Sequence, residues 1–397
     1  MTTPDVVVKL METLSQAVLR LRMEAGVMLA SFLLIWELCR VGYNSTSSPR
    51  ALNFAFKKDT TMSTSAPVTP ERIMQFAWSY VPTLVLEAAI HHRVFDVLDG
   101  GPKTLKETAE ATGASERGLR AVMNTLVGLN FLAKTDGHYA LTPESDAFLV
   151  STKPSFHGGL LRHTSGQLIP KWLQLNEVVA TGKPAAAVNQ EGAGSDFFQA
   201  FVADIFPMSY PSAQVLAKHL GLDGSESEVR VLDLAAGSGV WGIALAQSSE
   251  KVTVTAVDWI DVLPATEKMV TRFGLTDRFT FVSGDLQSAD FGSGHNVATL
   301  GHILHSEGEA RSKSLLKKTF DALAPGGTIS IAEFLVNPDR TGPVVSLFFA
   351  TNMLVNTDDG DTYSFEQISE WLTEAGFINA RLVEAPGPSP LVLATKP

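Results

Sequence analysis

Cysteine is nearly absent from this chain of 397 residues, in which Cys39 stands alone. A lone cysteine excludes an intrachain disulfide and fits a reducing compartment, so we expect a cytoplasmic protein. Basic residues are also few, because 31 lysines and arginines face 42 acidic residues and the formal net charge is −11. Non-specific nucleic-acid binding needs a basic surface, so this balance argues against nucleic acid as a partner.

A membrane span is not expected from the N-terminal apolar run. Residues 25–36 form an uncharged run of 12 residues, whereas a spanning helix needs roughly 20. A polar stretch, residues 43–67, follows, and Met62 opens a segment that resembles an ordinary protein start. We therefore interpret residues 1–61 as a dispensable extension. The alternative is a short helix that packs on the domain or on a membrane surface.

The rest of the chain has an ordinary globular composition, 45% hydrophobic and 18% charged, and is long enough for two domains. The pattern is mostly helical from about residue 71 to residue 217, and it alternates between strands and helices after Gly221. We expect residues 62–217 to form a helical domain and residues 218–397 to form an α/β domain.

The helical part contains a winged-helix pattern. Thr104 and Glu107 form a capping box that begins one helix, and Ser115 can cap the next. Asp136-Gly137 lies between two short strand-like runs and predicts a hairpin turn. A winged helix raises a DNA-binding hypothesis, but its second helix offers only Arg117 and Arg120 as cations. Packing against another subunit is the favoured interpretation.

The C-terminal part predicts a mostly parallel sheet covered on both faces. Its strand-like runs are Val229–Leu234, Val252–Val257, Phe279–Val282, Val297–Leu300 and Thr328–Phe334. Two further runs, Ala380–Glu384 and Leu391–Ala394, predict a terminal hairpin in which one strand runs antiparallel.

A glycine-rich loop follows the first of these strands and opens a helix. Its pattern is Gly237-x-Gly239-x-x-Gly242, and glycines let a backbone approach a ligand closely. This pattern alone does not select a cofactor, so an NAD-linked oxidoreductase stays possible at this point.

Three carboxylates lie at the ends of the predicted strands and bear on the choice. Asp233 gives the pattern Asp-x-Ala-x-Gly-x-Gly, which is similar to the signature of methyltransferases that use S-adenosylmethionine (SAM). SAM carries an ammonium and a sulfonium, so a nearby carboxylate makes electrostatic sense. Asp258 can accept from two ribose hydroxyls, in NAD or SAM alike. Asp285 can accept from an adenine amino group.

From about residue 70 to 397 the chain resembles class I SAM-dependent O-methyltransferases of the caffeate type, and bacterial members more than plant ones. The resemblance rests on VLDLAAGSG, AVDW, GDL, ILH, LAPGG and AEFLVNP, in that order. It implies a winged-helix dimerisation region, a Rossmann-like SAM domain and a homodimer that converts SAM to S-adenosylhomocysteine (SAH). The cofactor-binding residues it implies are Asp233, Gly237, Gly239, Asp258, Asp285, Leu286 and Gly301.

His305, in LGHILHSEGEA, matches the family's general base, and Glu333 falls where a carboxylate orients that histidine. A phenol is mostly protonated near neutrality, and a histidine can take its proton as the phenol attacks. The alternative is a hydrogen-bonded histidine without a catalytic role. His302 lies three residues earlier, on the same side of a helical turn, but no third metal ligand is evident and we expect no metal.

Four positions depart from the plant pattern. Ser306 and Glu307 replace Asp and Trp after the histidine, Gly301 replaces a Lys, and Thr362 replaces a second carboxylate. The departure at Gly301 predicts a lost contact near the adenine. The set weakens the case for phenol O-methylation specifically, so a carbon or nitrogen acceptor on a ring or pigment-like substrate stays open.

The acceptor pocket is expected between the two domains. The candidate residues are Trp172, Phe201, Phe206, Met208, Phe349, Asn352, Met353 and Asn356. Taken singly, each aromatic or methionine is better interpreted as ordinary core. Together they favour a flat, apolar acceptor, that is, a small aromatic or polyketide-like molecule. The remoter alternatives are the NAD-linked oxidoreductase and a winged-helix regulator.

Overall fold

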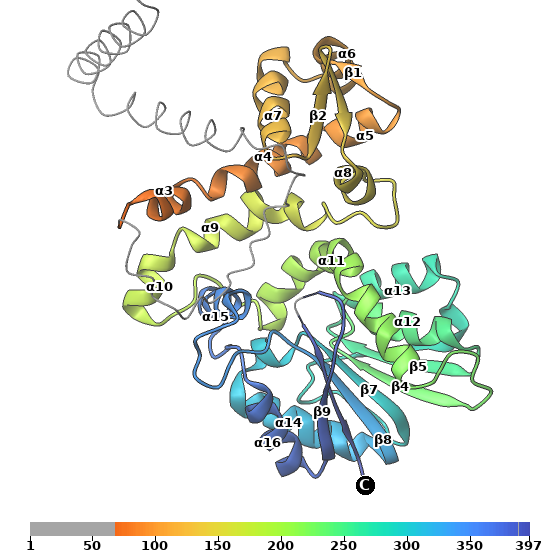
Figure 1. Cartoon of the computed structure of the whole chain (residues 1–397). Coiled ribbons are helices and arrows are strands. Elements are labelled where there is room, and N and C mark those ends of the chain that lie inside the picture. Colours follow the sequence, from red (N-terminus) through yellow and green to blue (C-terminus); the bar gives the residue numbers. More distant parts are fainter. Residues whose placement is uncertain (1–67, 388) are drawn as a thin grey trace, which may run out of the picture. The chain divides into compact units, whose positions relative to one another are not determined.

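The computed structural model describes residues 68–387 and 389–397, and Pro70–Pro397 form one unit by their contacts (Figure 1). The predicted extension, residues 1–61, and its apolar run lie outside the described residues. The predicted division into two domains at residue 217 stays a prediction. Helix α11 (Glu191–His219) runs across that boundary.

The first part of the described chain is the winged helix that the pattern predicts. Its elements are α3 (Glu71–Ala77), α4 (Tyr80–His91), α5 (Val94–Asp99), β1 (Lys103–Thr104), α6 (Leu105–Thr112), α7 (Glu116–Gly128), β2 (Leu132–Thr135), β3 (His138–Leu141) and α8 (Pro143–Phe148). The capping box of Thr104 and Glu107 is present, and Ser115 accepts from the backbone of Gly118. Asp136 and Gly137 both have positive φ and join β2 to β3.

An apolar surface extends over the first two helices. Residues 71–91 are long and apolar enough to cross a membrane by length and composition alone, and 11% of that window is buried. The structure divides the stretch into α3 and α4. The exposed large hydrophobic side chains here are Ile73, Met74, Phe76, Trp78 and Tyr80.

The described part of the chain contains a seven-stranded sheet in the order β6-β5-β4-β7-β8-β10-β9. The strands are β4 (Val229–Leu234), β5 (Val252–Asp258), β6 (Phe279–Ser283), β7 (His295–Gly301), β8 (Leu323–Ala332), β9 (Ile378–Val383) and β10 (Leu391–Thr395). The predicted antiparallel strand is β10, which pairs antiparallel with both β8 and β9. The expected bounds of β8 were wrong, because it begins at Leu323 and ends at Ala332, so Glu333 follows the strand.

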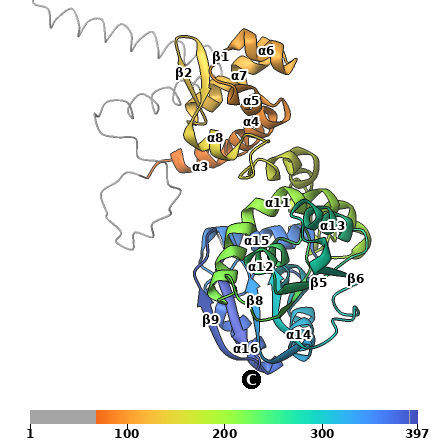
Figure 2. The same ribbon diagram turned by 90° about the vertical axis from the view of Figure 1, so that its right-hand side faces the viewer.

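Helices cover both faces of the sheet (Figures 1 and 2). Val229 and Val231 pack with α11, α12 (Val240–Ser248) and α13 (Leu263–Arg272). Leu232 and Leu234 point to the opposite face and pack with α14 (Leu304–Ala322) and α16 (Phe365–Ala375). This alternation follows from the two-residue period of a strand. The five parallel strands therefore end at one edge, which is where such sheets bind ligands.

Candidate active site

A cavity of about 370 Å³ lies at the carboxyl ends of the parallel strands. Its walls come from α11, from the loops after β4, β5, β6 and β7, from Phe334 after β8, and from α15 (Val344–Asn356). The lining is mostly apolar, with the polar groups gathered at a few places. This combination is typical of a site for a small organic ligand.

The glycine loop after β4 forms one wall. Gly237 and Gly239 have φ of 55° and 73°, in the left-handed region that glycine adopts without a steric cost. Gly237 lines the cavity and donates its N–H to Asp258 Oδ2 at 2.7 Å. A Cβ at Gly239 would lie 3.0 Å from Thr266, so Gly239 serves the turn into α12 rather than the cavity wall.

Asp233 lies behind this loop and is 1% exposed. Its carboxylate accepts from Thr299 Oγ1 at 2.7 Å and from the Gly242 N–H at 2.9 Å. Burial raises the pKa of Asp233 to about 7, although these hydrogen bonds lower it. Asp233 does not line the cavity, so the structure gives its carboxylate the task of fixing the loop and the start of α12.

Asp258, at the end of β5, does line the cavity. Its two oxygens accept from the N–H groups of Gly237 and Trp259, each at 2.7 Å. Burial raises the pKa of this carboxyl to about 6, against the effect of those two bonds. The carboxylate is therefore held in place before any ligand arrives, and each oxygen keeps accepting capacity for a hydroxyl donor.

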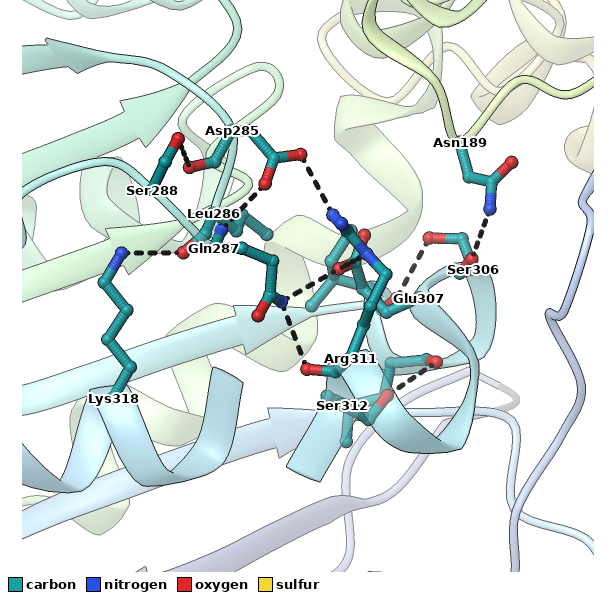
Figure 3. A network of polar contacts seen from close by, with 12 residues as sticks. Asn189, Asp285, Leu286, Gln287, Ser288, Ser306, Glu307, Arg311, Ser312 and Lys318 are labelled. Carbon is teal, nitrogen blue, oxygen red and sulfur yellow. Dashed lines mark hydrogen bonds and ion pairs between the residues drawn. The ribbon is translucent and has the colours of Figure 1, made fainter. Parts of the chain in front are cut away.

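Asp285 belongs to a charged network beside the cavity (Figure 3). Its Oδ2 accepts from Arg311 Nη2 at 2.9 Å, and Arg311 Nε donates to Glu307 Oε2 at 2.8 Å. The Gln287 side chain donates to the same Glu307 oxygen at 3.3 Å. Asp285, Leu286 and Glu307 line the cavity. The network orients Asp285. The sequence pattern did not indicate that Gln287, Glu307 and Arg311 would meet beside it.

The missing lysine at Gly301 has a steric explanation. Trp241 occupies the space, because a Cβ at Gly301 would lie 1.9 Å from the Trp241 indole nitrogen. Both residues line the cavity. Glycine at position 301 therefore leaves room for the buried Trp241 side chain from α12. The loss of a contact near the adenine stays a prediction.

His305 and Glu333 form a buried pair. The His305 Nδ1 and Glu333 Oε2 are 2.7 Å apart, and the His305 backbone N–H donates to Glu333 Oε1 at 3.2 Å. Burial alone would raise the pKa of Glu333, but the facing His305 outweighs it and lowers that pKa. Within the described residues, His305 Nε2 has no hydrogen-bond partner, and the side chain lines the cavity.

His302 does not share a helical turn with His305, so that expectation was wrong. It precedes α14 and has φ of 61°, which turns it toward the loop between β9 and β10. The two imidazole centroids are 6.5 Å apart. Across the described range, no group of three or more His, Cys, Asp or Glu side chains could hold a metal ion.

Two stacked aromatic rings stand beside His305. Phe334 and Phe349 are 4.0 Å apart between centroids, with planes 22° from parallel. Phe349 also meets the His305 ring edge-on at 4.7 Å. Both phenylalanines line the cavity, so the open nitrogen of His305 lies next to an apolar, flat surface.

The structure separates the acceptor candidates into two groups. Those that line the cavity are Phe201, Met208, Phe349, Asn352, Met353 and Asn356. Phe206 is core, because it is 7% exposed and stacks on Tyr210 and Phe273. Trp172 does not line the cavity, and its indole N–H donates to Asn352 at 3.2 Å. Helical periodicity could not tell these two from the rest, because core and cavity wall both require apolar residues.

Two family models match this chain. The O-methyltransferase dimerisation domain matches residues 74–151, and the O-methyltransferase domain matches residues 185–378. The chain belongs to the O-methyltransferase family. This enzyme is therefore a SAM-dependent O-methyltransferase, and the winged-helix part belongs to its dimerisation domain.

Relatives of this O-methyltransferase cover nearly its whole described length. The 3-hydroxy-5-methyl-1-naphthoate 3-O-methyltransferase of Streptomyces sahachiroi is 29% identical, over 82% of this chain and 95% of that protein. The tetracenomycin polyketide synthesis 8-O-methyl transferase of Streptomyces glaucescens is 28% identical, over 83% and 97%. A solved Nostoc punctiforme protein, assigned as a candidate O-methyltransferase, has a TM-score of 0.76 at 26% identity, over 83% and 100%.

The fold is shared with human N-acetylserotonin methyltransferase, solved in complex with SAM, at a TM-score of 0.72 and 22% identity, over 84% and 99% of the two chains. The cavity of this O-methyltransferase fits such a donor. One end offers two carboxylates, a glycine backbone and the apolar Leu286. That set suits a ligand with ribose hydroxyls and an aminopurine.

Some cavity residues were missed at the level of sequence. Trp259 lines the cavity next to Asp258. Its position directly after Asp258 in AVDW could have predicted this placement. Phe197 lines it too and stacks on Phe201 at 4.7 Å, one helical turn away. Ser389 had no signal, because it lies in a proline-rich connection that only the fold brings to the cavity.

Proposed function

We propose that this enzyme methylates a hydroxyl group on a small aromatic, polyketide-like acceptor, with His305 as the general base. The supporting observation is the ring of His305, whose Nδ1 is 2.7 Å from the buried Glu333 carboxylate. Its Nε2 has no partner in the described part of the chain, and the side chain lines an apolar cavity beside Phe334 and Phe349. A base held on one side and open on the other is what proton removal from a phenol requires.

His305 Nε2 takes the phenol proton as the oxygen attacks, and Glu333 stabilises the resulting imidazolium through Nδ1. When bound, SAM supplies the methyl group on a sulfonium. Gly237, Asp258, Asp285 and Leu286 are the residues that would hold it, through loop contacts, the ribose hydroxyls and the adenine. The aromatic wall orients the acceptor and excludes water.

The curated relatives support this acceptor class by their names, which specify a naphthoate and a tetracenomycin polyketide. A carbon acceptor is the second candidate. An L-tyrosine C(3)-methyltransferase from Streptomyces lavendulae is 25% identical over 83% of this chain, and removing the proton of a phenol also activates the ring carbon beside it.

The test is a screen of hydroxylated naphthalenes, and of matched rings without the hydroxyl, with labelled SAM. We expect transfer only to the hydroxylated members and a methoxy signal in the product. A methyl group on ring carbon would select the second candidate. His305→Ala should lower turnover roughly 10²–10⁴-fold while the Kd for SAH stays within about twofold; unchanged turnover would remove His305 from the mechanism.

We also propose that the enzyme is a homodimer that acts in the cytoplasm. The exposed apolar surface on α3 and α4 overlaps the segment that matches the dimerisation domain. This overlap supports burial of the surface against a second subunit rather than in a membrane. Sedimentation at micromolar concentration tests the dimer, and Trp78→Glu should shift the enzyme toward the monomer.

A further inference from the structure

A second polar group lies in the apolar half of the cavity and has no part in the reaction described above. His302 Nε2 and Ser389 Oγ are 2.9 Å apart. His302 follows β7, and Ser389 lies in the connection between β9 and β10, so two distant segments build this couple. Both residues line the cavity, and Ser389 is 4% exposed.

The backbone of His302 is in a conformation that is uncommon for any residue other than glycine. Its φ of 61° lies in the left-handed region, which glycine adopts without the steric cost that a side chain brings. The backbone is held there by the N–H of His302, which donates to Ala332 O at 2.9 Å. Strained residues cluster where a side chain serves a ligand, so the conformation is a reason to ask what this imidazole does.

His302 is not a second base. Burial lowers its pKa to about 4, although the nearby Glu333 raises it. The ring is therefore neutral at working pH and offers one N–H donor and one lone pair. Nε2 pairs with Ser389, and Nδ1 has no hydrogen bond to any residue of the described chain. Because the Ser389 hydroxyl can donate to Nε2 or accept from it, Nδ1 can carry the N–H or the lone pair. The free nitrogen can therefore pair with a carbonyl or with a hydroxyl.

The imidazole of His302 lies near that of His305 and next to the Phe334 ring. The centroid of His302 is 6.5 Å from that of His305 and 5.3 Å from that of Phe334. An aromatic acceptor that lies along Phe334 with a hydroxyl at His305 Nε2 would direct the neighbouring position of its ring system toward His302. An apolar substituent there would leave the Nδ1 of His302 without a partner, which is costly in a buried site.

We propose that His302 and Ser389 form a polar subsite that hydrogen-bonds a second oxygen of the acceptor, on the carbon next to the methylated hydroxyl or across a ring fusion from it. The proposal rests on the proposed function, because it assumes an aromatic hydroxyl at His305. It narrows the acceptor class to ortho- or peri-dioxygenated aromatics. His302 is then a specificity-determining residue.

The test compares the binding of matched probes to the SAH complex of the full chain by calorimetry. The pairs are 2-naphthol with 2,3-dihydroxynaphthalene, and 1-naphthol with 1,8-dihydroxynaphthalene. We expect the dioxygenated member of at least one pair to bind about tenfold more tightly, which is the worth of one hydrogen bond to a group that would otherwise stay unpaired. Binding needs no methyl transfer, so this readout is independent of the base.

Three variants separate a ligand contact from simple packing. His302→Gly removes the ring and suits the left-handed backbone, so we expect an unchanged or higher Tm. The two members of each probe pair should then bind with about equal affinity. His302→Asn tolerates the same φ, keeps an amide and should retain part of the preference. Ser389→Ala leaves the ring in place and should reduce the preference about threefold. A packing role would change the affinity for both members of a pair equally.

The outcomes are distinct. Equal binding within both pairs by the unchanged enzyme, or a preference that His302→Gly keeps, overturns the subsite. If no naphthol binds at millimolar concentration, the aromatic acceptor itself is wrong, and the subsite falls with it. If His305→Ala retains turnover while the preference follows His302, the general-base proposal fails and the subsite stands.

Discussion

The two ends of the cavity are built differently. At the donor end, polar groups are already paired: Asp258 holds the glycine loop, and Asp285 is paired with Arg311. At the acceptor end, aromatic rings surround two histidines, His302 and His305, each with one nitrogen free of hydrogen bonds to described residues. A preorganised donor end favours tight binding of one cofactor, whereas a largely apolar end with few polar groups sets which acceptor fits.

This difference predicts that changes at the acceptor end alter turnover and changes at the donor end alter cofactor affinity. After His305→Ala, the largest effect is expected for Glu333→Gln. The uncharged amide no longer stabilises the imidazolium of His305, so kcat should fall roughly 10²-fold. Steady-state assays with labelled SAM measure it. The Kd for SAH should stay within about twofold, and a comparable loss of SAH affinity would contradict the separation of the two ends.

Asp258→Ala should have the largest effect at the donor end. It removes a charged acceptor for hydroxyl donors and leaves the Gly237 N–H unpaired, so the Kd for SAH should rise about 30- to 100-fold. Calorimetry measures it. Asp258→Asn, which keeps an oxygen for the loop, is the matched control and should lose less. Equal effects of the two variants would mean that the oxygen kept by Asn contributes nothing and that the charge of Asp258 accounts for the whole loss.

Arg311→Gln should lower the affinity for SAH moderately, by weakening only the contact with the adenine amino group. Arg311 pairs with Asp285 at 2.9 Å and with the buried Glu307 at 2.8 Å (Figure 3), so its loss should release the Asp285 carboxylate. We expect SAH to bind about five- to tenfold more weakly. S-inosylhomocysteine, which lacks the adenine amino group, should bind as before.

The ratio of the two affinities is therefore the informative readout for this network. Arg311→Lys keeps the charge and should restore part of the ratio. An equal loss for both ligands would assign Arg311 a purely structural role.

The smallest expected effect is on pH dependence. The pKa of Asp258 is raised from 3.8 to about 6 in the free enzyme by burial, and hydroxyl donors favour its ionised form. SAH affinity should therefore be nearly full about one pH unit or more above 6 and be lost as the pH falls through 6, about fourfold between pH 7.5 and 5.5. Asp258→Asn should flatten the profile. A slope that survives in this variant would belong to Asp233, whose pKa is raised to about 7.

Much of the donor end could be predicted from the sequence. The glycine loop, Asp258, Asp285 and Leu286 all lie at strand ends or just after them, and the carboxyl ends of parallel strands meet at one edge. Asp233 shows the limit of that reasoning. A motif places it near the ligand edge, but only the packing shows its carboxylate buried against Thr299 and Gly242.

The acceptor end was predicted less well, because its residues come from segments far apart in the chain. Phe201 and Phe206 look alike in the sequence, yet one lines the cavity and the other stacks in the core. The left-handed backbone at His302 also overturned the expected helical turn.

The sequence by itself determined the fold class, the family and the cofactor, since these depend on local patterns: periodicity, capping and ordered motifs at strand ends. The tertiary structure alone decided which aromatic rings face the cavity, that Trp241 fills the space beside Gly301, and that Ser389 meets His302. The physical reason is that burial and side-chain pairing between distant segments depend on how helices and loops pack, and no local pattern specifies that packing.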